Sequence, residues 1–342
     1  MVEETDLYRM LDLQTPWCLH VAATLRIPQH IDTGHGEIAD LAAAAGCDRD
    51  VLHALLTYLV SKGVFHEPEP GRFACNHAAK QLAQAPFLDL NGIGGRMAHA
   101  WGTLLNYVRT GKPAYQDVFG RPFWEDLAAH PEVAADFDAL MGPAGHGIPD
   151  YDIELSAGWE HVRSIVDVGG GTGSMLVNLL RRHPRIRGTL VDLPATVARA
   201  EFGDVADRAT AIGQSFFDPL PGGANLYLLR KVLNDWPDAE TVAILRRCRE
   251  AATADRSTDR NTDRSSDTDG DTHGSGSVVV IGGVAPDDAP RPLAIDMLVA
   301  GGKTSTVAEF SGLAAQAGLA VVAAREQQAG FVVECQRERD AR

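Results

Sequence analysis

A short apolar, β-branched run leads into a cluster of glycines at Ile165-Val166-Asp167-Val168-Gly169-Gly170-Gly171-Thr172-Gly173. After Ser174, apolar side chains recur at helical spacing through residues 175–180, so the stretch is typical of a strand, a tight turn and a helix. Glycine lets the backbone take positive φ and approach a bound group, while the first N–H groups of the helix point into the same space. The sequence therefore predicts a ligand site at this turn.

The spacing of the glycines narrows the choice of ligand. Gly169, Gly171 and Gly173 form the pattern G-x-G-x-G, whereas the dinucleotide fingerprint G-x-G-x-x-G requires glycine where Ser174 stands. A phosphate-binding loop is excluded because no Gly-Lys-Ser/Thr triplet ends the turn. The next predicted strand ends at Asp192, where a carboxylate is placed to accept hydrogen bonds from a ribose diol. The ligand is therefore predicted to contain a nucleoside.

A third motif follows the next predicted strand, in the segment 213–221. Here Ser215 and an aromatic neighbour are placed to bracket an adenine ring. Together with Asp167 at the start of the glycine turn and with Asp192, this order of motifs favours S-adenosylmethionine over a nicotinamide cofactor.

From Val162 onward the chain alternates strand and helix patterns, which predicts an α/β unit with a parallel sheet and helices on both faces. The strands are expected at residues 164–168, 188–192, 209–212, 225–229, 278–283 and 331–335. The polar tract 252–277 has no apolar periodicity and is expected to be a disordered surface loop.

The N-terminal part reads as a winged helix. Helical patterns over 38–45 and 51–60 flank a short turn. The segments 64–67 and 72–74, joined by a Pro-Glu-Pro-Gly turn, suggest a hairpin wing. DNA binding is the first function that such a pattern suggests. Against it, the second helix has few basic side chains, Arg49 and Lys62, and the net charge is −15. A dimerisation or scaffolding role is therefore favoured.

Helical patterns also extend over residues 7–27 and 78–145, where most aromatic side chains are expected to be core. A proline and three glycines between 142 and 147 break this pattern and indicate a hinge. At 342 residues the chain is long enough for two domains, which we place at 1–150 and 151–342.

Composition excludes several classes of protein. The acidic balance argues against nucleic-acid and anionic-membrane partners. The five cysteines are widely spaced and lack a C-x-x-C pair, so neither a disulfide framework nor a metal site is expected. No leader or membrane-spanning run is evident, which predicts a cytoplasmic protein.

These motifs together resemble the bacterial S-adenosylmethionine-dependent O-methyltransferases of polyketide and other natural-product pathways. The resemblance covers nearly the whole chain and is carried by Leu13–Leu25, Val108–Tyr115, Phe119–Trp124, Asp167–Gly173, Ser215–Pro221, Val232–Asp238 and Gly301–Phe310. It implies a Rossmann-like class I methyltransferase domain with a mostly parallel seven-stranded sheet, an N-terminal winged-helix dimerisation domain and a homodimer. The tract 252–277 has no counterpart in that family.

The resemblance also implies roles for single residues. The glycine loop would hold the methionine part of the cofactor, Asp192 the ribose, Ser215 and Phe216 the adenine, and Arg230 would lie against the cofactor. By analogy, the small-molecule acceptor would be bound by Trp101, Asn106, Phe137, Met141 and Met297.

The chain departs from the family pattern at the catalytic base. Many relatives carry a histidine in a Leu-His-Asp-Trp motif, but here the motif reads Leu233-Asn234-Asp235-Trp236. An amide cannot accept a proton at physiological pH. One hypothesis is methylation by proximity and desolvation, with Asn234 orienting the acceptor hydroxyl.

Three other hypotheses stay open on the sequence. Another residue could be the base, for which His146, His99 and Asp296 are the candidates. The fold could bind the cofactor yet perform hydroxylation, decarboxylation or cyclisation. A cofactor-sensing winged-helix regulator is the alternative outside enzymology.

Overall fold

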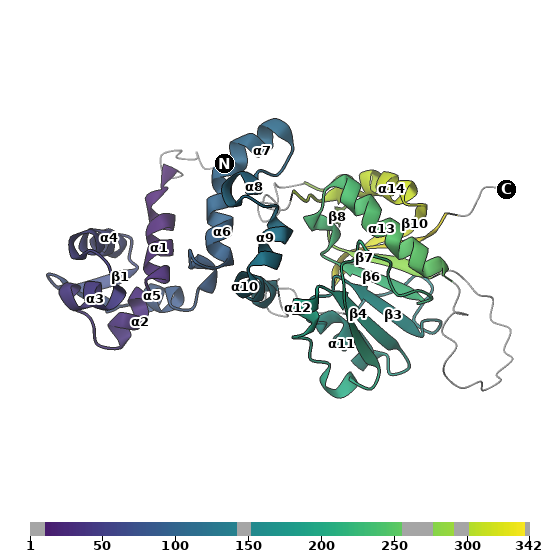
Figure 1. The fold of residues 1–342 in the computed structure, drawn as a ribbon, viewed down its shortest axis with the longest axis horizontal. Coiled ribbons are helices and arrows are strands. Elements are labelled where there is room, and N and C mark those ends of the chain that lie inside the picture. Colours follow the sequence, from purple (N-terminus) through teal and green to yellow (C-terminus); the bar gives the residue numbers. More distant parts are fainter. Residues whose placement is uncertain (1–10, 142–151, 255–275, 291–300, 339–342) are drawn as a thin grey trace, which may run out of the picture. The chain divides into compact units, whose positions relative to one another are not determined.

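The computed structural model describes residues 11–141, 152–254, 276–290 and 301–338 (Figure 1). The chain forms two compact units, Met1–Gly102 and Thr103–Arg342. The predicted hinge at 142–147 and most of the polar tract 252–277 lie outside the described residues. The helices between 104 and 141 belong to the second unit, and the domain boundary at residue 150 stays a prediction.

The first unit has the predicted helix–turn–helix and hairpin. Its elements are α1 (Gln14–Thr24), α2 (Ile27–Asp32), α3 (Ile38–Ala45), α4 (Arg49–Ser61), β1 (Phe65–Glu69), β2 (Arg72–Cys75), α5 (His77–Leu82), η2 (Pro86–Leu88) and α6 (Ile93–Ala100), and η3 (Trp101–Thr103) follows at the unit boundary. Strands β1 and β2 pair antiparallel as the expected wing. Their apolar side chains join α3 and α4 in one buried core that includes Leu41, Leu56, Phe65 and Phe73.

Local sequence explains where these helices begin and end. Helix α3 stops at Gly46, which has φ 65°, and α4 is capped by Asp48, whose carboxylate accepts the backbone N–H of Val51 at 2.9 Å. Of the helix predicted over 7–27, α1 covers the central part, and Pro16 lies in its first turn, where the missing N–H costs nothing.

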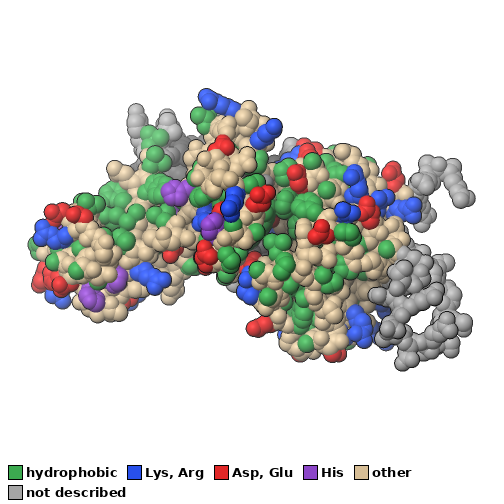
Figure 2. All heavy atoms as spheres, in the orientation of Figure 1, with side chains coloured by type: hydrophobic (Ala, Val, Ile, Leu, Met, Phe, Trp, Pro, Cys, Tyr) green, Lys and Arg blue, Asp and Glu red, His purple; other side chains and the backbone are tan. Residues whose placement is uncertain are grey.

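The basic side chains at the two ends of α4 are paired with acids. Arg49 contacts Asp50 at 2.7 Å, and Lys62 contacts Asp12 at 3.0 Å. On the face drawn in Figure 2, Lys and Arg side chains lie among Asp and Glu side chains. Phosphate groups would have to compete with these carboxylates for the same cations.

The second unit begins with a helical segment made of α7 (Leu104–Thr110), α8 (Tyr115–Phe119), α9 (Phe123–Ala129) and α10 (Pro131–Met141). The prediction that most of its aromatics are core holds for Tyr115 and Phe123, which are buried, whereas Tyr107, Phe119, Trp124 and Phe137 are half-buried. Tyr115 donates its hydroxyl to the buried Asp126 at 2.6 Å, so the polar end of the ring is satisfied inside the segment.

A seven-stranded sheet forms the body of the second unit, with the order β10-β11-β7-β6-β3-β4-β5. Its strands are β3 (Ser164–Val168), β4 (Arg187–Asp192), β5 (Ala209–Gly213), β6 (Leu226–Arg230), β7 (Ser277–Ile281), β10 (Leu319–Gln327) and β11 (Gly330–Arg337). Only β11 runs against the others, so the mostly parallel prediction is confirmed. The six predicted strands are present, and β10 was missed because it is a half-exposed edge strand whose alanines favour a helix and which follows α14 (Val307–Gln316) after only two residues.

Helices cover both faces of this sheet (Figure 1). Alternate strand residues point to opposite sides: Val166 packs in the cluster with α13 (Asp238–Thr253) and α14 (Val307–Gln316), while Ile165 packs in the cluster with α11 (Ser174–Arg182). Short elements complete the unit, namely α12 (Pro194–Val197), η4 (Gly203–Val205), η5 (Leu233–Asp235), β8 (Val284–Ala285) and β9 (Ser305–Thr306).

The strand order reverses at β3, which pairs with β4 on one side and with β6 on the other. In open parallel sheets such a switch point leaves a crevice outside the carboxyl ends of the strands, where ligands bind. The segments that follow β3, β4 and β6 therefore surround the expected site. Among the described residues, no helix has both the length and the apolar character needed to cross a membrane.

Candidate cofactor and acceptor site

The glycine turn after β3 requires glycine for its backbone shape. Gly169, Gly171 and Gly173 have φ of 68°, 62° and 89°, a region that residues with a Cβ rarely adopt. A Cβ built on Gly169 would lie 2.8 Å from a methyl carbon of Val232. A Cβ on Gly171 would meet no atom within 4 Å, so this side of the turn faces open space.

Asp192 is joined to the turn by direct hydrogen bonds. Its Oδ2 accepts the backbone N–H of Gly171 at 2.8 Å, and its Oδ1 accepts that of Leu193 at 2.7 Å. Burial raises the pKa of this carboxyl, and the two amide donors partly offset that effect. The structure thus brings Asp192 and the glycine turn together, although 21 residues separate Asp192 from Gly171.

Asp167 lies beneath the turn at the end of β3 and is fully buried. A Cβ on Gly170 would collide with its carboxylate and with Leu190. Because Gly170 has no side chain, the carboxylate of Asp167 can lie directly under the turn. Gly173 is the N-cap residue of α11, and no side chain caps this helix. Its first backbone N–H groups are therefore available to a ligand bound at the turn.

The motif after β5 also lies beside the turn. The ring of Phe216 would be 3.4 Å from a Cβ on Gly169, and Ser215 Oγ accepts the backbone N–H of Phe217 at 3.2 Å. Phe216 in turn meets the ring of Trp236 edge on, with centroids 5.7 Å apart. Arg230 is the last residue of β6, next to β3 in the sheet.

The segment after β6 contains the Asn-Asp pair. Lys231 takes φ 53°, an uncommon conformation for a side chain of its size, and the chain then turns into η5. Asn234 Nδ2 donates to Asp235 Oδ1 at 2.8 Å. Burial raises the pKa of Asp235 to about 7, and the charge of Lys231 opposes that rise.

Sequence reasoning considered Asn234 but missed Asp235. The signal was present, because an acidic residue follows Asn234 directly in the motif Leu233–Trp236. Its surroundings were not readable, since they come from segments far apart in the chain. Carbon atoms built on Gly283 and Gly302 would both collide with the backbone of Asn234, so two glycines allow the segment to be enclosed.

Aromatic side chains from the helical segment meet the site at Trp236. Trp124 stacks on Trp236 with centroids 5.7 Å apart and an interplanar angle of 16°. Phe137 contacts Trp124 edge on at 5.6 Å. Of the predicted acceptor residues, Phe137 therefore joins an aromatic group that reaches the cofactor motif through Trp236 and Phe216.

The other predicted acceptor and catalytic residues are less connected. Asn106 is exposed and donates to Asp117 at 3.2 Å. Trp101 is 40% exposed at the end of the first unit, and His99 contacts Trp17 within that unit. His146, Asp296 and Met297 lie outside the described residues, as does the side chain of Met141. Their roles stay predictions.

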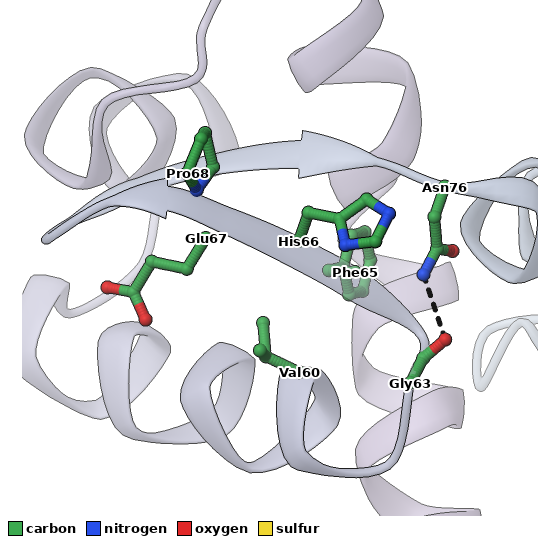
Figure 3. A pocket seen from close by; sticks show the side chains of 7 residues that line it. All are labelled: Val60, Gly63, Phe65, His66, Glu67, Pro68 and Asn76. Carbon is green, nitrogen blue, oxygen red and sulfur yellow. Dashed lines mark hydrogen bonds between the residues drawn. The ribbon is translucent and has the colours of Figure 1, made fainter.

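A hollow of about 640 Å³ lies in the first unit, between the end of α4 and the β1–β2 hairpin (Figure 3). Asn76 closes one side with a hydrogen bond of 2.8 Å to the carbonyl of Gly63. His66 and Glu67 also line it, but none of the predicted site residues does. In the described part of the chain, no three His, Cys, Asp or Glu side chains are grouped to hold a metal ion.

Two family models match this chain. An O-methyltransferase domain matches residues 101–320, and an O-methyltransferase dimerisation domain matches residues 10–85. The chain belongs to the O-methyltransferase family. The methyltransferase has the class I fold that the sequence predicted, and its cofactor is S-adenosylmethionine, the methyl donor of the family.

Among curated proteins, the methyltransferase is 41% identical over 339 residues to the 2,7-dihydroxy-5-methyl-1-naphthoate 7-O-methyltransferase of Streptomyces carzinostaticus, covering 95% of each chain. It is also 41% identical over 260 residues to the aclacinomycin 10-hydroxylase of Streptomyces purpurascens, covering 70% of this chain and 67% of that one.

Among solved structures, it is similar to an O-methyltransferase from neocarzinostatin biosynthesis, solved in complex with S-adenosyl-L-homocysteine and 1,4-dihydroxy-2-naphthoic acid. The TM-score is 0.81 at 37% identity, covering 98% of this chain and 100% of that one.

Proposed function

We propose that this methyltransferase methylates a phenolic or enolic hydroxyl of an aromatic, polyketide-type acceptor. The observation that carries the proposal is the aromatic group of Phe137, Trp124 and Trp236, which ends against Phe216 of the cofactor motif. Flat side chains stacked in this way suit a flat acceptor next to the methyl donor. The naphthoate methyltransferase relative supports the same acceptor class.

The residues at the turn fit the cofactor. Gly171 leaves open space on one side, and the buried carboxylate of Asp192 is held next to it, which suits a ribose diol. We assign the methionine part to the turn of Gly169–Gly173 above Asp167, and the adenine to Ser215 and Phe216. Arg230, at the end of β6, would flank the cofactor on the other side.

When bound, the cofactor supplies an electrophilic methyl group on a sulfonium. The chain has to place the acceptor oxygen in line with that methyl group and to exclude water, which raises the effective concentration of the reactants. Asn234 is proposed to orient the acceptor hydroxyl, because its side chain lies in the enclosed segment after β6. His146 and Asp296 remain candidates as predicted by the sequence.

We also propose a homodimer in the cytoplasm. The dimerisation-domain match supports the dimer, as do the exposed apolar side chains Leu13 and Trp17 on and beside α1. All five cysteines are free thiols, as expected in a reducing compartment. Light scattering during gel filtration should give twice the mass of the chain, and a monomer at micromolar concentration would contradict the dimer.

The function is tested by incubating the protein with labelled S-adenosylmethionine and a panel of hydroxynaphthoates and other phenols. We expect labelled O-methyl product and an equal amount of S-adenosylhomocysteine. Aliphatic alcohols of similar size serve as the control, because they neither stack on the aromatic group nor ionise readily. Turnover of those alcohols alone would contradict an aromatic acceptor.

A second candidate function is hydroxylation of an aromatic polyketide. It is favoured by Asn234 in the place of the usual histidine and by the 41% identity to a hydroxylase. In that case the protein would bind S-adenosylmethionine tightly and release no S-adenosylhomocysteine with any acceptor of the panel. With a thiol reductant added to supply the two electrons that reduce the second oxygen atom to water, oxygen uptake and a product heavier by one oxygen atom would then be measured.

A further inference from the structure

We propose that Asp235 is the proton acceptor of the reaction, with Asn234 holding its carboxylate in position beside the acceptor hydroxyl. The proposal rests on the proposed methyl transfer and assigns a base to this chain, which has Asn234 where many relatives have the histidine. It gives Asp235 a chemical role in addition to its place in η5.

The first support is the position of Asp235 in the fold. It follows β6 at the switch point of the sheet, where the crevice opens. Val232, three residues earlier, is in contact range of the glycine turn, and the next residue, Trp236, meets Phe216. Asp235 therefore lies in the segment that joins the cofactor motif to the aromatic group.

The second support is the direction of the hydrogen bond between the two side chains. A carboxylate only accepts, so the amide of Asn234 must present Nδ2 to Asp235 Oδ1, at 2.8 Å. This bond anchors one carboxylate oxygen. The other, Oδ2, has no hydrogen-bond partner among the described residues and can receive a proton.

The third support is the rigid enclosure of the pair. Gly283, with φ 76°, and Gly302 pack against the backbone of Asn234 so closely that any side chain at either position would collide with it. Lys231 adds an uncommon backbone conformation just before the pair. Such local strain is found where a side chain must be held in a defined place.

The electrostatic surroundings suit a base at neutral pH. Burial raises the pKa of Asp235 to about 7, and the positive charge of Lys231 limits this rise. Gly283 and Gly302, which pack against the pair, carry no charge. Lys303, next to Gly302, forms an ion pair with Asp238 at 2.9 Å. A base whose pKa lies near the working pH is ionised often enough to act and is still basic enough to accept a proton.

The chemical step balances without a further reactant. The acceptor O–H bond breaks as its proton moves to Asp235 Oδ2, and the oxygen forms a bond to the methyl carbon. The carbon–sulfur bond breaks, and its electron pair neutralises the sulfonium to give the thioether. The proton on Asp235 passes to solvent when the products leave.

The test compares Asp235→Asn with the wild type over pH 5.5 to 9, using S-adenosylmethionine and 1,4-dihydroxy-2-naphthoic acid in single-turnover experiments. The wild-type rate should rise with pH to a plateau, with a midpoint near 7. The variant should lose about 100-fold at pH 8 and lose this rise. Asp235→Glu should restore part of the rate together with the rise.

The matched control is Asp207→Asn, which removes an exposed carboxylate between η4 and the edge strand β5. It should leave the pH profile unchanged. Infrared spectroscopy gives a readout independent of turnover, since a protonated carboxyl band should titrate near pH 7 in the wild type and be missing in Asp235→Asn.

The outcomes separate the two proposals. Turnover by the wild type with an unchanged pH profile in Asp235→Asn would overturn the role of Asp235 alone. Absence of the titrating carboxyl band would overturn it as well. A wild-type protein that binds S-adenosylmethionine and methylates no acceptor would overturn both.

Discussion

The cofactor side and the acceptor side of the site are built in different ways. At the glycine turn the backbone makes the site: three glycines at positive φ, the first N–H groups of α11, and Asp192 bonded to a turn amide. After β6 the site is made of side chains, with the Asn234–Asp235 pair and the stacked Trp236.

This difference explains which changes each side tolerates. A backbone site needs particular φ values, and those depend on glycine regardless of what is packed nearby. A side-chain site depends on burial and on partners from distant segments, so a substitution changes chemistry or packing and leaves the local chain path as it was. We therefore expect cofactor affinity and catalytic rate to respond to different substitutions.

The largest effect is expected for Gly171→Ala. The methyl group points into the open space beside the turn, and φ of 62° is unfavourable for alanine. Affinity for S-adenosylhomocysteine should fall about 100-fold by calorimetry, which corresponds to about 2.7 kcal/mol. Gly111→Ala is the control. Gly111 also has a positive φ, 66°, and a Cβ there would meet no atom within 4 Å, so this variant should keep the wild-type affinity. If both variants keep wild-type affinity, the turn is not the cofactor site.

The next effect is expected for Trp236→Leu, which removes the ring shared by both sides. Its contacts with Trp124, Phe216 and Phe217 are lost, so the free energy of unfolding should fall by about 2 kcal/mol. Cofactor affinity and turnover should both decrease. Trp159→Leu is the control, since Trp159 stacks on His183 in another part of the unit and should affect stability only.

A smaller effect, of opposite sign, is expected for the stability of Asp235→Asn. The folded pKa of about 7 lies above the ordinary 3.8, so the stability that the neutral carboxyl contributes is complete below about pH 4 and is lost as pH rises to 7. At pH 8 the wild type carries an enclosed charge that the variant lacks. Urea unfolding should show the variant more stable by about 1 to 2 kcal/mol at pH 8. Equal stability at pH 8 would mean that the carboxyl is well solvated.

The smallest effect is expected for Asn234→His, which introduces the residue that the family motif has. An imidazole next to Asp235 provides a second base, so the rate at pH 7 should increase about threefold to tenfold. Asn234→Ala serves as the control and should decrease the rate, because the anchor of Asp235 is lost. A rate below wild type in both variants would show that the amide itself is required.

Much of the fold could be predicted from sequence because it depends on short-range patterns. Short apolar runs, rich in β-branched residues, located six of the seven strands. Strand β10 was missed because its alanines favour a helix and it follows α14 after only Ala317 and Gly318. Helix ends were readable where a glycine or a capping aspartate stands, as at Gly46 and Asp48.

The closeness of the cofactor motifs was also readable, while their contacts with the cofactor stay predictions. Asp167 and Asp192 lie at the carboxyl ends of β3 and β4, and the three glycines follow β3, so order along the chain implies closeness in space. The acceptor side was not. Nothing in the order of residues indicates that Trp124 stacks on Trp236, or that Phe137 joins the group, because helix-to-loop packing is not fixed by periodicity.

The sequence therefore determined six of the seven sheet strands, the glycine turn, the cofactor and the absence of a histidine at residue 234. Only the tertiary structure decided what replaces that histidine. The pKa of Asp235 depends on burial by the segments around Gly283 and Gly302 and on the charge of Lys231, and burial is a property of packing. In the unfolded chain the side chain of Asp235 is an ordinary carboxylic acid. Burial in the folded protein raises its pKa to about 7, so that it can act as a base at neutral pH.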